Sequence, residues 1–349
     1  MDDRGLLLVN LGTPASTEVA DVRAFLAEFL GDPWVIDLPT PFRQALVRGI
    51  ICPVRGPRSA EAYREIWTDE GSPLLVHSQR LAAKVAALRP ERPVVLAMRY
   101  GKPSIAAGIA ALRERGVRRV TLLPLFPQRS SSTTTTTVEA VRREIARSGG
   151  GMELDPILDF FAHPGFVRAQ AAAARPLIEE LAPERILASY HGVPEDYLRK
   201  DDPGGSHCLW SADCCATVGP ENAGCYRAQC RATSRALAAE LGRPETEVLT
   251  AFQSRFGSKR WTVPATDEVV VALARQGVRR LLVLCPAFVA DCLETLEEIG
   301  LRLRETFLEA GGEAFAVAPC VNADDAWAEG VVAIVRDHEA SSSPSSSRG

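Results

Sequence analysis

The sequence lacks the features that would indicate a membrane-spanning, secreted or nucleic-acid-binding protein. It has no apolar run long enough to cross a bilayer. Its net charge of -4 provides no basic surface on which to hold a nucleic acid. The first apolar stretch, Leu6–Val9, is too short for a signal-peptide core and has neither a basic flank nor a small-residue cleavage site. We therefore expect a cytoplasmic protein that acts on small molecules and has no nucleic-acid partner.

The composition is that of an ordinary globular protein over most of the chain. Its 349 residues are 46% hydrophobic and 24% charged, which suffices for two units that each bury a core. The serine-rich stretch from Ala340 to Ser347 offers no apolar surface to bury. We therefore predict a disordered tail over residues 339–349.

The alternation of apolar runs with amphipathic stretches of helix length predicts an α/β fold with doubly wound parallel sheets. An internal repeat refines this prediction. A strand, a helix and a second strand are indicated over residues 94–124, and the same order recurs over residues 248–284. In both copies a Gly-Val-Arg-Arg sequence leads into the second strand, at Gly116 and at Gly277. Two similar units are implied, one in each half.

The glycine-rich stretch Ser148–Gly151 is a natural linker between these units, so we expect two halves, over residues 1–150 and 151–338. Ligands of doubly wound folds bind beyond the carboxyl ends of the strands. The residues that directly follow the expected strands are therefore candidate site residues: Asn10, Arg99 with Tyr100, 124–137, His191 and 286–298.

Two of these positions offer groups that could move protons or bind a metal. His191 follows the apolar run Ile186–Tyr190, where an imidazole can accept protons near neutral pH, although a structural histidine would fit the same place. We read residues 291–298 as a helix whose spacing aligns Asp291, Glu294 and Glu298 on one face. That row is either a solvated surface or a set of oxygen ligands for a divalent cation.

The segment 124–137 contains a run of hydroxyl residues just before an expected helix. Hydroxyls and backbone N–H groups at a helix start, with Arg129 and Ser130 beside them, suit an anionic substituent. Capping of the helix alone would also explain the serines and threonines.

Nine cysteines are present, and five of them are crowded into the segment 201–231. They are Cys208, Cys214, Cys215, Cys225 and Cys230. Without a secretion signal, such a cluster more often binds a metal than forms disulfides. Thiolates suit iron–sulfur clusters and zinc alike, and no C-x-x-C pair favours a zinc ribbon. Neighbouring side chains of an extended segment alternate, so we expect that either Cys214 or Cys215 is not a ligand and that four of the five are.

Motifs along nearly the whole chain resemble the ferrochelatase family. In order they are Leu8–Pro14, Tyr63–Arg64, Gly71–Leu74, Met98–Gly101, Pro124–Gln128, Tyr190–Pro194, Phe252–Gly257, Trp261–Asp267, Asp291–Leu296 and Pro319–Asn322. Any one of them would be weak evidence, whereas this order is specific.

The resemblance implies two Rossmann-like halves around a central porphyrin cleft, the chelatase fold. It assigns His191 and Glu294 as the catalytic pair and adds Asp291 and Glu298 as an acidic metal path. Arg99 and Tyr100 match residues of the family's pocket. The implied reaction is insertion of ferrous iron into protoporphyrin IX to give protohaem, with Fe(II) as a substrate. Removal of two pyrrole protons requires a base, which His191 would supply with help from Glu294.

The resemblance also implies an apolar lip over the cleft. Trp34, Val35, Ile36 and Leu38 would form it together with residues 42–51, although a buried helix would give the same pattern. An exposed lip could touch a membrane and collect porphyrin there. Two positions depart from the family: Cys292 replaces a frequent histidine, and Arg129 replaces a frequent aromatic residue, which leaves its contact with a propionate open.

The segment 201–231 resembles the part of another group of bacterial ferrochelatases that binds a [2Fe-2S] cluster. Zinc and reactive or disulfide-bonded cysteines are the alternatives. Other functions left open are a coproporphyrin ferrochelatase, a chelatase for another tetrapyrrole, a carrier of haem or porphyrin, and an unrelated small-molecule binder. Homodimerisation and membrane association are open as well.

Overall fold

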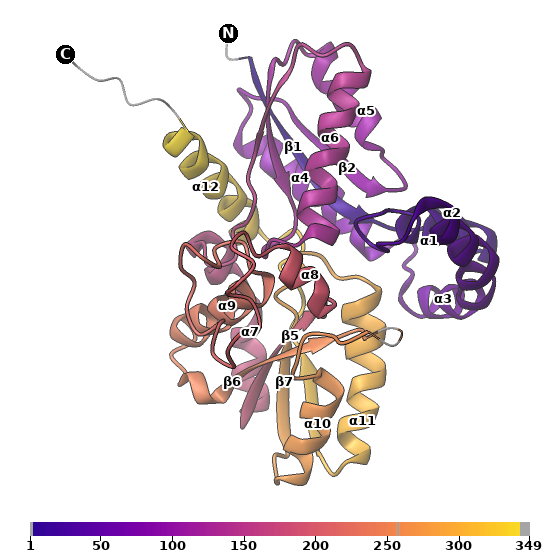
Figure 1. Ribbon diagram of the computed structural model, residues 1–349. Coiled ribbons are helices and arrows are strands. Elements are labelled where there is room, and N and C mark those ends of the chain that lie inside the picture. Colours follow the sequence, from indigo (N-terminus) through magenta and orange to yellow (C-terminus); the bar gives the residue numbers. More distant parts are fainter. Residues whose placement is uncertain (1–2, 256, 258, 343–349) are drawn as a thin grey trace.

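The computed structural model describes residues 3–255, 257 and 259–342. It contains two parallel four-stranded sheets, one above the other in Figure 1. The first sheet has the order β2-β1-β3-β4, and the second has the order β6-β5-β7-β8. The strands are β1 (Arg4–Gly12), β2 (Val94–Tyr100), β3 (Arg119–Pro124), β4 (Glu153–Pro156), β5 (Arg185–His191), β6 (Val248–Gln253), β7 (Arg280–Leu284) and β8 (Ala314–Val317). The predicted α/β class and the predicted parallel sheets are confirmed.

Helices cover both faces of each sheet. In the first half they are α1 (Val19–Leu30), α2 (Thr40–Leu46), α3 (Cys52–Ile66), α4 (Pro73–Leu88), α5 (Ile105–Glu114) and α6 (Thr136–Arg147). In the second half they are α7 (Pro164–Leu181), α8 (Glu195–Lys200), α9 (Tyr226–Glu240), α10 (Thr266–Arg275), α11 (Arg304–Glu309) and α12 (Asp325–Ser342). Three π-helical segments, Val47–Ile51, Ser131–Thr135 and Glu294–Leu303, and a 3-10 turn, Glu245–Glu247, complete the elements.

The internal repeat appears as two sheets with the same strand order. The unit β2-α5-β3 corresponds to β6-α10-β7, and β1 and β5 each occupy the second position of their sheet. The division that we expected at residue 150 falls between α6 and β4. Because β4 pairs with β3, the first sheet extends to Pro156.

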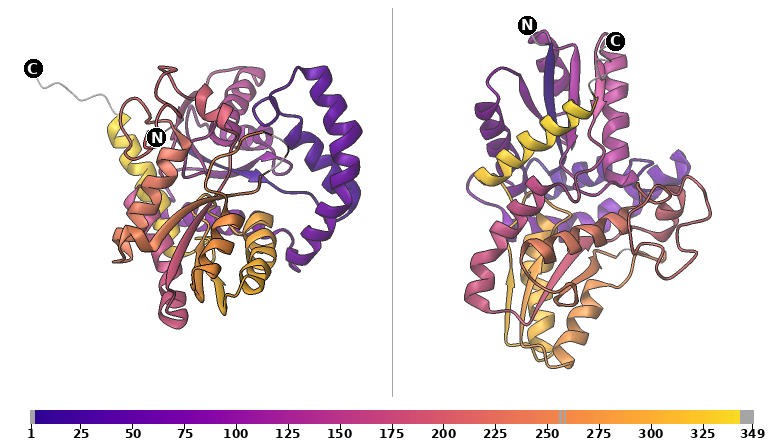
Figure 2. Two further views of the ribbon diagram at one scale, coloured as in Figure 1. Left: turned by 60° about the horizontal axis from the view of Figure 1, so that its bottom comes forward. Right: turned by 90° about the vertical axis from the view of Figure 1, so that its left-hand side faces the viewer.

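The central strands are apolar on both faces because both faces are covered. In β1, Leu6 and Leu8 face a core that also contains residues of β5, β7 and α12, whereas Leu7 and Val9 face α5 and α6. One hydrophobic core is therefore common to both halves. Helix α12 packs on α7 and on α4, and Figure 2 shows it passing from the second half to the first.

The predicted tail is shorter than expected. Helix α12 continues through Ser342, because Glu339 forms ion pairs with Arg89 and Arg92 that hold its last turns against the first half. The prediction for residues 343–349 lies outside the described residues.

Candidate active site

His191 ends strand β5 and lies at the carboxyl edge of the second sheet. Its imidazole Nδ1 is 2.7 Å from the carbonyl oxygen of Gly192. Because a carbonyl only accepts hydrogen bonds, Nδ1 of the neutral ring carries the proton, and Nε2 keeps a free lone pair. The residue is half-buried, with its ring centroid 6.4 Å from that of Phe288. This tautomer leaves Nε2 able to accept a proton.

The peptide between His191 and Gly192 is held at both ends. The hydroxyl of Tyr226 donates to the carbonyl oxygen of His191 at 2.7 Å. The Gly192 N–H donates to the carbonyl oxygen of Gln253 at 2.8 Å. A Cβ at Gly192 would lie 2.9 Å from the same oxygen, so only glycine fits this close approach. The sequence pattern indicated His191 but not Tyr226.

Glu294 and Glu298 lie on the π-helical segment that follows β7. The hydroxyl of Ser254 donates to the Glu298 carboxyl at 2.6 Å. Burial raises the pKa of Glu298, the Ser254 hydrogen bond and His191 lower it, and Glu294 raises it further. Glu298 therefore lies within electrostatic reach of both His191 and Glu294.

Asp291 differs from Glu294 and Glu298 in its position and in its hydrogen bonds. The helix begins after it, and its carboxylate accepts hydrogen bonds from Asn322 Nδ2 at 2.7 Å, from Thr295 Oγ1 at 3.1 Å and from the Cys320 N–H at 3.2 Å. Its own N–H donates to Asn322 Oδ1 at 2.8 Å. Both oxygens of the buried Asp291 carboxylate therefore accept hydrogen bonds from the protein. The oxygen ligands of a metal path would instead be open to the metal.

Arg99 and Tyr100, at the end of β2, both contact Asp32 in the turn after α1. Arg99 forms a buried ion pair with the Asp32 carboxylate, and the Tyr100 hydroxyl donates to it at 2.9 Å. The Thr136 hydroxyl, at the start of α6, donates to the same carboxylate at 2.7 Å. No pattern in the sequence indicated Asp32, because its partners lie 67 to 104 residues away.

The residues expected to form the lip lie in the turn 31–39, in α2 and in the π-helical segment Val47–Ile51. They pack with α1 and α3 in one apolar cluster, which Tyr100 also joins. The turn is fastened to α8: the Tyr197 hydroxyl donates to the carbonyl oxygen of Val35 at 2.8 Å, and Lys200 forms an ion pair with Asp37. Ile36 packs on the apolar cluster, whereas Leu38 is 39% exposed. In Figure 1 these helices project from one side of the first half.

The helix that we expected to follow residues 124–137 begins within that segment, at Ser131. The Ser130 hydroxyl pairs with that of Ser132 at 3.0 Å. Burial raises the pKa of both Asp159 and Asp201, and the charge of Arg129 lowers both. The guanidinium of Arg129 therefore lies near two carboxyls, and this arrangement does not favour the expected anion site.

Residues 201–225 of the cysteine-rich segment form turns between α8 and α9, and residues 226–231 are the start of α9. Cys214 Sγ lies 3.6 Å from Cys215 Sγ, which lies 3.9 Å from Cys225 Sγ. The argument from an extended segment is wrong here, because a turn lets Cys214 and Cys215 face the same side. Cys208 is buried nearby and Cys230 is buried within α9. Among the described residues, no three His, Cys, Asp or Glu side chains are arranged to hold a metal ion.

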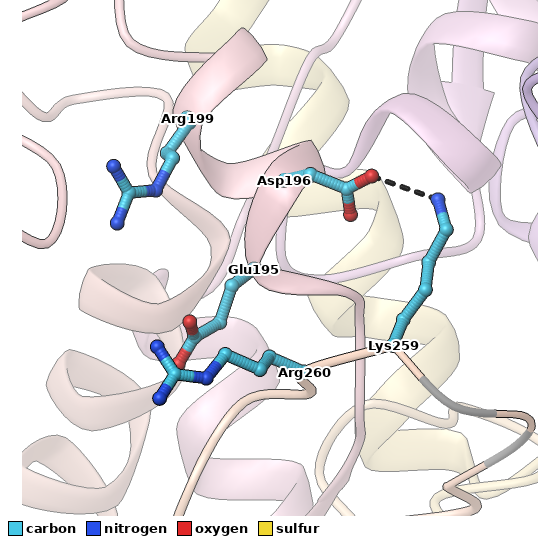
Figure 3. Close-up of a pocket in the computed structure, with 5 residues that line it drawn as sticks. All are labelled: Glu195, Asp196, Arg199, Lys259 and Arg260. Atoms are coloured by element: carbon cyan, nitrogen blue, oxygen red, sulfur yellow. Dashed lines mark hydrogen bonds and ion pairs between the residues drawn. The ribbon is translucent and has the colours of Figure 1, made fainter.

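Two adjoining pockets lie beside the loop that follows His191. One of about 280 Å³ is lined by Glu195, Asp196 and Arg199 of α8 and by Lys259 and Arg260 (Figure 3). The other, of about 620 Å³, shares Glu195, Lys259 and Arg260 with it and is also lined by Arg255, Gly257, Trp261 and Val263. Neither pocket is lined by His191 or Glu294, so both are separate from the catalytic groups assigned above.

Comparison with protein families decides the identity. The ferrochelatase family model matches residues 3–339. The chain belongs to the ferrochelatase family. No helix in the described part of this ferrochelatase-family chain is long and apolar enough to cross a membrane.

Curated ferrochelatases match over almost their full length. The ferrochelatase of Azotobacter vinelandii is 51% identical over 337 residues, which cover 96% of this chain and 99% of the relative. The ferrochelatase of Pseudomonas fluorescens strain SBW25 is 49% identical over 330 residues, covering 94% of this chain and 96% of the relative.

Solved structures show a similar fold. SirB from Bacillus subtilis with Fe3+ has a TM-score of 0.54 at 12% identity, covering 98% of this chain and 97% of its own. The sirohydrochlorin chelatase SirB from Bacillus subtilis subspecies spizizenii, in complex with cobalt, has a TM-score of 0.52 at 10% identity, covering 97% and 95%. At these identities the likeness concerns the fold alone.

Proposed function

We propose that this chain inserts ferrous iron into protoporphyrin IX to give protohaem. The observation that carries the proposal is the His191 imidazole of a ferrochelatase-family chain, with Nδ1 bonded to Gly192. The carboxyl of Glu298, which is itself near Glu294, lies within electrostatic reach of this imidazole. Such a site combines a base with oxygen donors, the two groups that metal insertion into a porphyrin requires.

In this mechanism the porphyrin loses two pyrrole protons and gains Fe²⁺, so the charges balance without any redox step. His191 Nε2 accepts a pyrrole proton, and the Glu294 carboxylate helps to remove protons from the opposite side of the macrocycle. Glu294 and Glu298 offer oxygen ligands that replace the water of the incoming iron, which is a substrate. Asp291 serves instead to fix the start of this helix, through its hydrogen bonds to Asn322 and Thr295.

Arg99 and Tyr100 shape the wall of the porphyrin site, and Ile36 and Leu38 lie in the lip beside it. The charge of Arg99 is already paired with Asp32, and its guanidinium carbon lies 4.4 Å from the centroid of the Tyr100 ring. Arg99 therefore orders the wall and the lip rather than presenting a free cation to a propionate.

The test is a metal-insertion assay with Fe²⁺, Co²⁺ and Ni²⁺ against protoporphyrin and coproporphyrin. We expect Fe²⁺ with protoporphyrin to be the preferred pair and His191→Ala to abolish turnover. His163→Ala, which removes a histidine that caps α7, is the matched control and should stay active. Near-normal turnover by His191→Ala would remove the base, a preference for coproporphyrin would change the substrate, and porphyrin binding without turnover would indicate a carrier.

A [2Fe-2S] cluster in the segment 201–231 is the second part of the proposal. Cys208, Cys214, Cys215 and Cys225 are its ligands. Each iron of such a cluster takes two thiolates, and the short sulfur contacts of Cys215 suit that arrangement. The pKa of Cys225 is lowered to about 6, chiefly by its contact with Cys215 and then by N–H groups at the start of α9. A thiolate is the form that binds iron.

Cys230 is the cysteine left out of this set. It is fully buried on α9 and packs with Tyr190 and Tyr226. Cys208 touches the same apolar cluster but lies within electrostatic reach of both Cys214 and Cys225. When bound, the cluster would supply one-electron chemistry and a cross-link between turns of the segment. The residues Cys214, Cys215 and Cys225 already bring those turns together.

Visible absorption of freshly purified protein, with iron and acid-labile sulfide counts, tests the cluster. We expect two irons and two sulfides per chain. Cys225→Ser should lose the absorption. Cys230→Ser, the same substitution at a buried cysteine five residues further along α9, is the matched control and should keep it. Colourless protein with one zinc per chain would refute the cluster, and loss of colour in Cys230→Ser would change the ligand set.

Contact of the lip with a membrane surface, in the cytoplasm, is the third part. Phe42, Ile50 and Val54 on the continuous helix from α2 to α3 are 69%, 60% and 61% exposed. Such neighbouring apolar side chains mark an interaction surface. We expect co-sedimentation with phospholipid vesicles that is lost in Phe42→Ser/Ile50→Ser. A homodimer that these substitutions dissociate, with no vesicle binding, would overturn the membrane contact.

A further inference from the structure

Tyr226 connects the cysteine-rich segment with the catalytic histidine. It is the first residue of α9 and directly follows Cys225, which occupies the N-cap position of that helix. Its side chain is 5% exposed and packs among Tyr190, Val193 and Phe252. The hydroxyl reaches back across this cluster to the carbonyl oxygen of His191, at 2.7 Å.

The peptide that receives this hydrogen bond controls the direction of the imidazole. Its N–H end is fixed by Gln253, and its carbonyl end is fixed by Tyr226. The next carbonyl along the chain, that of Gly192, holds His191 Nδ1. Gly192 has no side chain to limit its backbone angles, so the turn is restrained by hydrogen bonds. They are the two bonds to the preceding peptide and the bond from the Val193 N–H to Thr262 Oγ1 at 3.1 Å. Loss of the Tyr226 bond would free the carbonyl end of the His191–Gly192 peptide and so loosen the backbone from which the His191 ring extends.

The other end of the connection is the group of sulfurs. Cys225 Sγ contacts Cys215 Sγ, and the Cys225 N–H donates to the carbonyl oxygen of Asn222 at 2.8 Å. Asn222 in turn donates from Nδ2 to the carbonyl oxygens of Cys214 and Thr217, at 3.0 and 2.8 Å. A change in the arrangement of the sulfurs therefore moves the start of α9, where Tyr226 lies.

We propose that Tyr226 is a positioning residue for His191, and that through it the arrangement of the sulfurs in the cysteine-rich segment sets the orientation of the imidazole. Tyr226 itself touches neither porphyrin nor iron in this proposal. The inference rests on the proposed function in taking His191 as the base.

Tyr226→Phe, which keeps the ring and removes the hydroxyl, tests the first step. The matched control is Tyr190→Phe: its hydroxyl pairs with Ser234 at 2.9 Å in the same apolar cluster and makes no bond to the His191 peptide. We expect kcat to fall by about tenfold in Tyr226→Phe, a usual cost of losing an outer-shell partner, with KM for porphyrin unchanged. Tyr190→Phe should keep the wild-type kcat. Equal kcat values for the two variants, or a change confined to KM, would overturn the proposal.

A readout independent of activity comes from the histidine signals. The chain has five histidines, so ¹⁵N-histidine NMR gives few ring resonances, and His191→Ala assigns the one of interest. We expect Tyr226→Phe to shift the His191 resonance and Tyr190→Phe to leave it in place. An unshifted resonance overturns the positioning role whatever His191→Ala does to turnover. An active His191→Ala enzyme removes the proposed base without affecting the NMR result.

The coupling to the sulfurs is tested with Cys225→Ala, which also serves if Tyr226→Phe does not fold. We expect Cys225→Ala to shift the His191 resonance and lower kcat in the wild-type background. In the Tyr226→Phe background it should lower kcat much less, because the connection is already broken. Equal effects of Cys225→Ala in both backgrounds, or no shift of the His191 resonance, would refute the coupling. Circular dichroism and thermal melting confirm that each variant is folded.

Discussion

Replacement of Asp32 by asparagine should be the most informative single change in the first half. The Asp32 side chain is 3% exposed and its partner Arg99 is 14% exposed, so the ion pair lies almost wholly out of water. Asparagine keeps the shape and removes the charge, which leaves the Arg99 guanidinium buried without a counter-ion. Breaking a buried pair in this way costs about 3–5 kcal/mol. Because Arg99 also donates to Thr136 Oγ1 at 2.9 Å, we expect about 3 kcal/mol, the lower end of that range.

The assay is urea denaturation followed by tryptophan fluorescence, since Trp34 and Trp67 lie on or beside the lip. Asp37→Asn is the matched control: it makes the same change five residues later, in an ion pair with Lys200 whose side chains are 52% and 57% exposed. Exposed pairs contribute at most about 1 kcal/mol, so the control should lose little. Asp32→Asn should also raise KM for porphyrin, because the lip and the Arg99 wall share this carboxylate. Equal losses of stability for the two variants would refute the reasoning.

Three further predictions concern the rest of the molecule. Trp327→Ala should destabilise the protein by about 3–5 kcal/mol in urea denaturation, because this fully buried ring packs on Phe160 and Phe166 and would leave a cavity. A loss below about 0.5 kcal/mol, the size expected of a surface substitution, would contradict it. Tyr197→Phe should raise KM for porphyrin and speed hydrogen exchange in residues 32–38, since it removes the bond from α8 to Val35; unchanged exchange would show that this bond does not hold the lip. Burial raises the pKa of the Asp159 carboxyl, so the folded state holds its proton more tightly than the unfolded state, and stability falls as pH rises through the raised pKa. Asp159→Asn should therefore gain stability relative to wild type between pH 4 and neutral pH; a constant difference in urea midpoints would refute this.

The sheets could be predicted because their signals are local. Residues Leu6–Val9 are consecutive and apolar, as a strand covered on both faces requires, and the two Gly-Val-Arg-Arg sequences mark equivalent strands. The position of His191 after such a strand followed from the same rule. These features depend on neighbours in the sequence, which composition and periodicity report directly.

The contacts that finish the site are not local. Asp32 contacts Arg99 and Thr136 only after the chain folds. Asp291 is hydrogen-bonded by Asn322, which lies 31 residues further along the chain. The orientation of Cys214 and Cys215 depends on a turn rather than on an extended segment, and alternation rules do not apply to a turn. Residue spacing could place these side chains near the site but could not assign their partners.

The core that β1 and β3 share with β5, β7 and α12 has a mechanical consequence. Although the two sheets have the same strand order, neither could be excised without exposing part of this common interior. Packing in this shared core therefore fixes the position of one half relative to the other. Helices α1, α2 and α3 pack in an apolar cluster that is distinct from this common interior, so they are the part of the first half that does not depend on it.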